Sequence, residues 1–128
     1  MVKIRTHEKI DRILCGEPIF TEDGASKVKM IATASMTVDD TGLVHGGFIF
    51  GLADHAAMIA VNHPNVVLAA AEVKFLKPVK SDDSLLAEAR VPHEADKKRI
   101  VIVTVKKGDI EVFKGTFTCF VPEKHVLG

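Results

Sequence analysis

The chain has 128 residues, 47% of them hydrophobic and 27% charged, and its formal net charge is +0. At this length and composition we expect one domain with one packed core over residues 1–128, and a disordered polyelectrolyte is excluded. The balanced charge also argues against a dedicated nucleic-acid binder, because such a protein needs a basic surplus to displace counterions from phosphate.

Apolar residues first recur near the N-terminus, at Ile10, Ile13 and Leu14 among charged residues. This spacing predicts a short amphipathic helix over about residues 6–15, which Gly16 would end. The same segment lacks the apolar stretch and the cleavage site of a secretory signal.

Two cysteines, Cys15 and Cys119, show no CxxC or metal-type spacing. Without a targeting signal they are expected to be reduced thiols of a cytoplasmic protein. The longest apolar run, residues 48–61, is interrupted by Asp54 and His55 and is too short to cross a bilayer comfortably. No membrane partner is therefore expected.

Residues 25–38 alternate in polarity, which predicts a long amphipathic strand with one wet face. Residues 39–42, DDTG, are typical of a turn. Residues 46–63 are continuously apolar and longer than a typical strand, so we predict a helix buried on nearly all sides, with Pro64 ending it. Four further strands are predicted, over residues 66–76, 84–91, 99–106 and 110–121.

This order of helix, long strand, buried helix and four strands sets the architecture. A meander of long antiparallel strands needs a partner for its apolar face, and residues 46–63 are the only candidate. The fold class is therefore predicted as α+β, with one curved antiparallel sheet of five to six strands wrapped around one central helix. Such a sheet leaves edges and one face exposed, which dimerisation would cover.

The start of this helix, His45-Gly46-Gly47, is the first candidate site. A helix start presents unpaired backbone N–H groups and the positive end of the macrodipole. Because Gly46 and Gly47 have no side chains, a carbonyl or oxyanion can approach these donors closely. His45 could add a donor or orient a group, which is how an oxyanion site is commonly built.

Asp54 lies two turns into the same helix and is the residue best suited to chemistry. Gly47 and Gly51 fall on its face and leave a groove, and aliphatic neighbours would desolvate the carboxylate and raise its pKa. A purely structural Asp54, facing water or accepting a hydrogen bond, stays open on these grounds. His55 points to a different face, where a structural or interfacial role is expected. No metal-binding motif occurs in the sequence, so no metal ion is expected.

Residues 42–54, GLVHGGFIFGLAD, resemble the signature of the PaaI-like acyl-CoA thioesterases of the hotdog-fold superfamily, in which a helix opens with HGG and an Asp follows nine residues after the His. Residues 72–80, EVKFLKPVK, resemble the next strand and turn of that family, and residues 84–91 resemble the strand after it. The resemblance covers about residues 25–121. It implies the hotdog fold, in which a highly curved sheet wraps around a central helix.

The same resemblance implies hydrolysis of an acyl-CoA thioester at a site shared by two subunits of a homodimer or homotetramer. The N–H of Gly47 would polarise the thioester carbonyl, and His45 would position the thioester. Asp54 would reach the site across the dimer as general base or nucleophile. No separate cofactor is implied, because CoA is part of the substrate.

Substrate contacts are expected from six residues, namely Gly46, Gly51, Asp39, Phe75, Lys77 and Lys80. Asp39 marks a departure from the family, because many relatives have Asn about six residues before the His. A second carboxylate could repel Asp54 or take over its role. The two lysines, together with residues 97–99 (KKR), are candidates for meeting the CoA phosphates.

Two other functions stay open. A hotdog domain can bind acyl-CoA without catalysis, as ligand sensors inside regulators do. The spacing of Asp40 and His45 also resembles the Asp/His pair of hydratases that act on 2-enoyl-CoA with the same fold, although Gly46-Gly47 is not their pattern.

Overall fold

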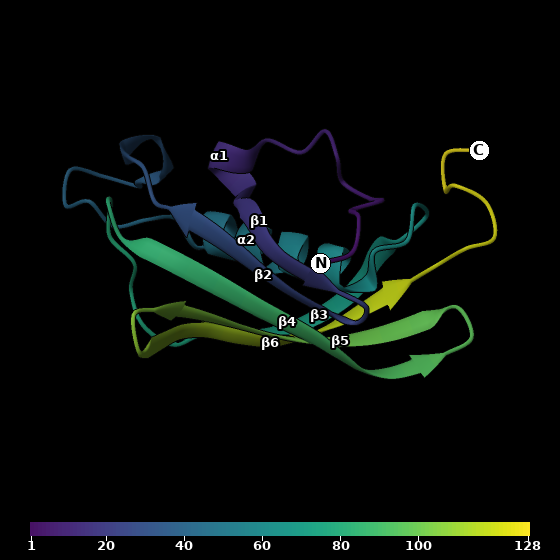
Figure 1. The fold of residues 1–128 in the computed structure, drawn as a ribbon. Coiled ribbons are helices and arrows are strands. Elements are labelled where there is room, and N and C mark those ends of the chain that lie inside the picture. Colours follow the sequence, from purple (N-terminus) through teal and green to yellow (C-terminus); the bar gives the residue numbers. More distant parts are fainter.

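The computed structural model describes the backbone of all 128 residues and the side chains of all except His93 and Ala95. Its elements are α1 (Arg12–Cys15), β1 (Glu17–Glu22), β2 (Ala25–Ile31), the 3-10 turn η1 (Ala34–Met36), α2 (Gly46–Val61), β3 (Val67–Phe75), β4 (Ser84–Ala95), β5 (Lys98–Lys107) and β6 (Ile110–Phe120). The six strands form one antiparallel sheet in the order β1-β2-β4-β5-β6-β3. Figure 1 shows this sheet curved around α2, which confirms the predicted architecture.

The central helix α2 is buried along most of its length, because its small and aliphatic side chains pack against the sheet. Its fully buried residues are Leu52, Ala53, Ala56, Ala57 and Ile59. The alanines let the sheet approach the helix backbone closely, and the Ser26 hydroxyl of β2 donates a 2.6 Å hydrogen bond to the Ala56 carbonyl. The helix ends at Val61, two residues before the predicted end, because Asn62 takes a left-handed conformation with a φ of 52°.

The N-terminal segment is fastened to the end of α2 by the side chain of Asn62. The Asn62 side-chain oxygen accepts a 2.7 Å hydrogen bond from the Arg5 N–H, and the Asn62 amide donates a 2.8 Å bond to the Lys3 carbonyl. Both polar atoms of a residue that is only 6% exposed are thereby satisfied. Residues that precede the first helix therefore belong to the folded body of the domain.

The predicted N-terminal helix is shorter than expected, because only α1 forms within residues 6–15. The Asp11 carboxylate accepts the N–H groups of Ile13 and Leu14 at 2.9 and 3.0 Å, which fixes the start of α1 at Arg12. Gly16, with a φ of 97°, ends α1 as predicted.

The long strand predicted over residues 25–38 is wrong beyond Ile31, where β2 ends. The Ala32 N–H leaves the ladder and donates to the Asp83 carbonyl at 2.9 Å, and η1 follows. Met36 is nevertheless fully buried, which is why the alternation continues past the strand. β1 is a further difference from the prediction, because its exposed edge position removes the apolar alternation that would have revealed it.

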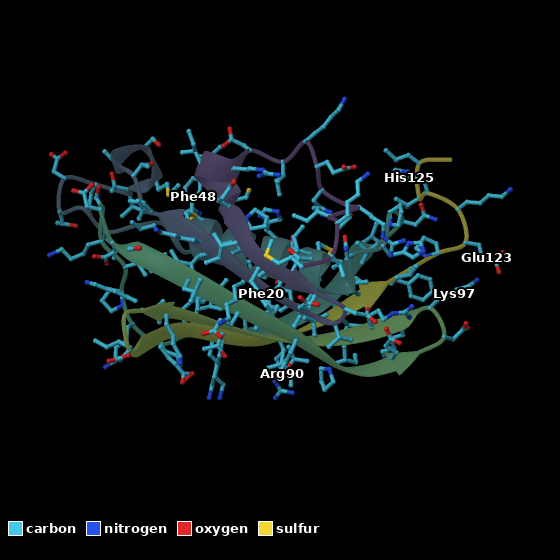
Figure 2. The ribbon with its side chains drawn as sticks, in the orientation of Figure 1. Phe20, Phe48, Arg90, Lys97, Glu123 and His125 are labelled. Atoms are coloured by element: carbon cyan, nitrogen blue, oxygen red, sulfur yellow. The ribbon has the colours of Figure 1, made fainter. Side chains whose placement is uncertain are left out.

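The four strands predicted after α2 are confirmed as β3, β4, β5 and β6, and β4 extends four residues further than predicted. The turn between β4 and β5 is joined to the C-terminal segment by an ion pair of 3.4 Å between Lys97 and Glu123, both labelled in Figure 2. None of the described helices is both long and apolar enough to cross a membrane.

The edge strand β3 leaves part of the sheet uncovered beside α2. Its central residues, Ala69, Ala70, Ala71 and Glu72, are exposed, although β6 pairs with the other side of the strand. The adjoining face of α2 is also incompletely covered, since Gly47 is exposed and Gly51 and Asp54 are half-buried. We call these three helix residues the uncovered strip.

Candidate active site

The start of α2 is held in place by backbone hydrogen bonds from two sides. The His45 N–H donates to the Met36 carbonyl at 2.9 Å, and the Val44 N–H donates to the Val79 carbonyl at 2.8 Å. Within the part of the chain that the structure describes, no acceptor takes the N–H of Gly46 or Gly47. The first turn of α2 therefore presents free donors at a fixed position, as the sequence predicted.

His45 occupies the N-cap position of α2, but its side chain makes no capping hydrogen bond. The imidazole turns back over the first turn instead, where a Cβ built on Gly47 would lie 2.9 Å from His45 Nε2. The ring of Phe48 meets the imidazole edge-on at a centroid distance of 6.0 Å. His45 and the Gly47 N–H thus lie side by side, which permits both to contact one carbonyl group.

Asp54 carries an isolated carboxyl group on the uncovered strip. Its Oδ1 is buried and has no hydrogen-bond partner among the described residues. Burial raises the pKa of Asp54 to about 6. A buried polar atom without a partner costs free energy, so it commonly marks a position where a ligand, a water molecule or another chain supplies the missing contact.

Gly51 lies one turn before Asp54 and is open to the outside of the protomer. A Cβ built on Gly51 meets no described atom within 4 Å. The chain itself therefore gives no packing reason for a glycine here, although glycine costs about 1 kcal/mol relative to alanine inside an exposed helix. The structure therefore leaves open space at Gly51, one turn from Asp54.

Phe75 and Lys77 meet the start of α2 from the end of β3. A Cβ built on Gly46 would lie 3.1 Å from Phe75 Cε1, so the absence of a side chain at Gly46 lets the Phe75 ring pack against the helix start. Beside this contact lies an apolar recess of about 300 Å³, which both residues line. Sequence reasoning missed four aliphatic residues of the lining, namely Val44, Ile49, Val79 and Val112.

The two groups of basic residues lie at opposite ends of the sheet. Lys80 adjoins the start of β4, where its N–H donates to Asp83 Oδ2 at 2.8 Å. Residues 97–99 follow the end of β4, about 35 Å away along the strand at roughly 3.3 Å per residue. Of these five candidate cations, Lys77 and Lys80 are therefore the two placed near the start of α2 within one protomer.

Asp39 and Asp40 lie in the predicted turn, and both are exposed. The Asp39 carboxylate accepts the Thr41 N–H at 2.9 Å and also the Thr41 hydroxyl. Both hydrogen bonds lower the pKa of Asp39, and the bond from the Thr41 hydroxyl has the larger effect. Asp39 therefore shapes its own turn, and its carboxylate stays ionised at neutral pH.

His55 has a structural position, as expected. It is 1% exposed, and its Nδ1 lies 3.0 Å from the Cys15 carbonyl. The imidazole of His7 stacks on it at a centroid distance of 6.4 Å.

Both cysteines are free thiols. Burial, and to a smaller extent the nearby Asp54 carboxylate, raises the pKa of Cys119 to about 12. A thiol with such a pKa is unreactive at neutral pH.

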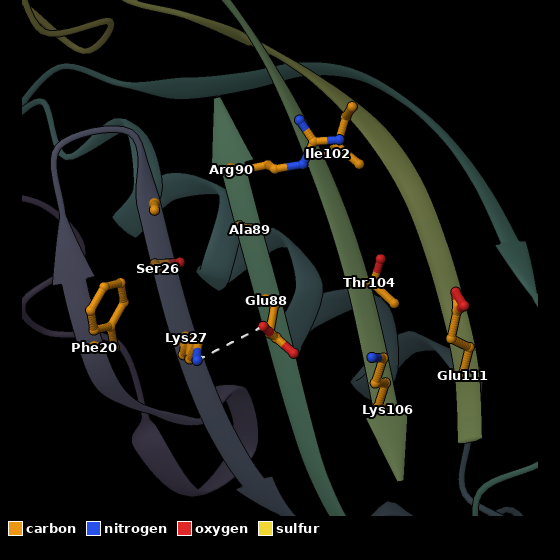
Figure 3. A pocket seen from close by; sticks show the side chains of 11 residues that line it. Phe20, Ser26, Lys27, Glu88, Ala89, Arg90, Ile102, Thr104, Lys106 and Glu111 are labelled. Atoms are coloured by element: carbon orange, nitrogen blue, oxygen red, sulfur yellow. Dashed lines mark ion pairs between the residues drawn. The ribbon is translucent and has the colours of Figure 1, made fainter. Parts of the chain in front are cut away.

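A larger hollow, of about 400 Å³, lies on the face of the sheet turned away from α2 (Figure 3). Outward-facing charged side chains line it, and Lys27 Nζ pairs with Glu88 Oε2 at 4.0 Å. Exposed ion pairs of this length contribute little binding energy. The free donors and the isolated carboxyl lie on α2, so the candidate site is placed there.

A family model described as "Thioesterase superfamily" matches residues 41–114, a span that contains the HGG start, the Asp54 carboxyl and the β3–β4 turn. The chain belongs to the thioesterase superfamily. The curved sheet around one helix is accordingly the hotdog fold, as the resemblance implied.

The curated relatives of this thioesterase-superfamily chain carry other names. A methylthioribose-1-phosphate isomerase of Aquifex aeolicus is 53% identical over 114 residues, which are 89% of this chain and 25% of that protein. A transcription factor FapR of Caldanaerobacter subterraneus is 31% identical over 113 residues, which are 88% of this chain and 56% of that protein. The chain thus spans a quarter and just over half of these two relatives.

Solved structures match the superfamily fold over almost the whole chain. An uncharacterized protein of Pyrococcus horikoshii is 51% identical with a TM-score of 0.98, covering 99% of this chain and 98% of that one. The PaaI protein of E. coli is 26% identical with a TM-score of 0.80 and coverage of 88% and 83%. A Streptococcus mutans protein solved with acetyl CoA is 28% identical with a TM-score of 0.80 and coverage of 94% and 99%.

Proposed function

We propose that this protein is an acyl-CoA thioesterase that hydrolyses a thioester to a free acid and CoA. The observation that carries the proposal is the buried Asp54 Oδ1 without a partner, on the same helix whose first turn presents free N–H groups. Membership of the thioesterase superfamily supports it. So do structural relatives solved with CoA and with acetyl CoA, from Streptococcus pneumoniae and Streptococcus mutans.

In the proposed reaction the thioester carbonyl oxygen accepts the Gly47 N–H, and His45 holds the thioester beside it. Ionised Asp54 takes a proton from water, whose oxygen adds to the carbonyl carbon; the carbon–sulfur bond then breaks, and the proton passes from Asp54 to the departing CoA thiolate. In the alternative route Asp54 itself adds to the carbon and displaces the CoA thiolate. Water then splits the resulting anhydride into the free acid and Asp54, and the proton released passes to the thiolate. Lys77 and Lys80 are proposed to meet CoA phosphates at the rim.

A second copy of the chain is proposed to complete the site. Asp54 lies seven residues after Gly47, which is about 10 Å along a helix at 1.5 Å per residue, too far for both to touch one thioester directly. The uncovered strip lies on α2, which contacts β3, and the centre of β3 is itself exposed, so together they offer a surface that a second copy can cover. Asp54 of one subunit would then face Gly47 of the other in a homodimer, alone or within a homotetramer.

The test is a thiol-release assay on purified protein over short, long and aromatic acyl-CoAs. Wild type should release CoA from at least one of them, and Asp54→Asn should lower that rate at least a hundred-fold. Asp23→Asn is the matched control, because Asp23 is an exposed carboxylate in the turn between β1 and β2. Equal rates for wild type and Asp54→Asn would overturn the role of Asp54.

A non-catalytic acyl-CoA-binding module is the second candidate. The similarity to transcription factor FapR favours it, because this relative is named as a regulator and not as an enzyme. Binding of CoA esters measured by calorimetry, with no thiol release from any of them, would decide for this candidate. Thiol release at a rate that depends on Asp54 would decide against it.

A further inference from the structure

The recess beside the first turn of α2 is built almost entirely from aliphatic side chains. Val44, Ile49, Val79 and Val112 form its inner surface and are at most 5% exposed. The ring of Phe75, which is 56% exposed, stands at its side against Gly46. The recess therefore runs from the surface, next to the free N–H groups of α2, into buried hydrocarbon.

The lining distinguishes between the two parts of an acyl-CoA. Of the nine described residues that line the recess, Lys77 has the only polar side chain. The pantetheine arm of CoA carries two amide groups, which would lose their hydrogen bonds to water here without finding protein partners. An acyl tail is hydrocarbon and loses no hydrogen bonds on entering such a site.

The volume bears on the length of the tail. At about 300 Å³ the recess lies at the lower end of the range of small-molecule pockets, roughly 300–1,000 Å³, so it suits short and medium acyl groups better than long ones. We propose that the recess binds the acyl tail of the substrate and makes the enzyme prefer hydrocarbon acyl groups of short and medium length. Val112 and Phe75 are then specificity-determining residues. This inference rests on the proposed thioesterase activity.

Two variants change the recess in opposite directions. Val112→Phe places a ring inside it and should move the preferred acyl length at least two carbons shorter. Phe75→Ala removes an exposed wall, so the fold should tolerate it, and should move the preferred length longer. Phe120→Ala is the matched control, because Phe120 is another exposed phenylalanine, 42% exposed, which pairs with Val67 and Lys98 at the far end of β6.

The experiment measures kcat/KM for a straight-chain series from acetyl-CoA to palmitoyl-CoA. Wild type should peak among the short and medium chains and be at least ten-fold slower on palmitoyl-CoA, with the peak displaced in the two recess variants and unmoved in Phe120→Ala. A wild type equally fast on octanoyl-CoA and palmitoyl-CoA would overturn the assignment. So would recess variants that change all chain lengths by one common factor.

Failure of the proposed activity has a separate signature. If wild type hydrolyses no acyl-CoA of the series, the thioesterase proposal fails, and calorimetric Kd values for the same series then decide the role of the recess. A Kd that is tightest among the short and medium chains, and shifts in Phe75→Ala but not in Phe120→Ala, supports acyl binding there. A Kd independent of chain length overturns it.

Discussion

The imidazole of His45 lies so close to Gly47 that a Cβ added to Gly47 would stand 2.9 Å from His45 Nε2. In a Gly47→Ala variant the exposed ring can swing away, so we expect thermal unfolding to change little. The new methyl group and the displaced ring obstruct the carbonyl site, so thiol release should fall at least ten-fold. Adding His45→Ala removes the clash but should not restore the rate, whereas full recovery in the double variant would contradict both the role of His45 and the need for an open site at Gly47.

Asp54 should reduce the stability of the subunit at neutral pH. Its pKa is about 6 in the folded chain against an ordinary 3.8, so the folded state binds the proton more tightly and stability falls as pH rises from about 4 to 6. Asp54→Asn should therefore be more stable than wild type at pH 8 by about 1–2 kcal/mol, after a discount for partial exposure. Urea unfolding at pH 4 and pH 8 measures this gap, which should be near zero at pH 4. A gap of equal size at both values would refute the linkage.

The same carboxyl predicts how the rate depends on pH. If ionised Asp54 is the base or nucleophile, kcat/KM should rise about ten-fold per pH unit below pH 6 and level off above pH 7. Thiol release followed from pH 4.5 to 8.5 gives the profile. A rate that does not change across this range would rule out titration of Asp54 in the free enzyme.

Substitution of Gly51 by alanine should change stability and activity in opposite directions. A methyl group at this position meets no described atom within 4 Å, so Gly51→Ala should stabilise the fold by about 0.5–1 kcal/mol through helix propensity. If substrate or a second subunit occupies the open space at Gly51, the same variant should lose thiol release. Gly115→Ala is a contrasting control, because its Cβ would lie 2.7 Å from Val73 Cγ1 and should destabilise the sheet. A Gly51→Ala enzyme that keeps the wild-type rate would show that neither substrate nor a second subunit uses this space.

His55 should make the fold sensitive to acid. Burial lowers the pKa of this imidazole in the folded chain, so the unfolded chain binds more protons, and stability is lost as pH falls through 6.5. His55→Gln should cost about 1–2 kcal/mol at pH 8, because the contact with the Cys15 carbonyl is weakened. The gap to wild type should narrow at pH 5, as measured by urea unfolding. His125→Gln is the control variant, because His125 is exposed and its substitution leaves the contact between His55 and the Cys15 carbonyl in place.

The sequence predicted the parts of the fold in which burial and backbone period agree. The continuously apolar α2 and the strand β5, whose burial alternates along most of its length, are examples. The alternation of apolar residues gave a wrong strand where side chains stay buried after the strand has ended, as at Met36 in η1. It gave no prediction where the element is mostly exposed, as in β1. Periodicity reports which side chains are buried and only indirectly which backbone carries them.

At the candidate site, short-range sequence reasoning located Gly47, Gly51 and Asp54 because they share one helix face. The contact between Phe75 and Gly46 depends on how the end of β3 packs against the start of α2. Residue spacing along the chain does not predict such a contact. The local bonding of Asp39 to Thr41 also emerged only from the structure. Contacts between distant segments, which form the recess, were therefore the part that one sequence could not supply.

The pairing of β3 with β6 has a consequence for how the chain is made. Within the described sheet β3 forms its ladder with β6 alone, and residues 76–109 lie between the two strands. On the ribosome β3 therefore emerges long before its partner and waits, alanine-rich and unpaired, until the last strand of the chain appears. Any product that terminates before Ile110 carries that open strand permanently, and should be recognised by chaperones or aggregate rather than persist as a smaller folded domain.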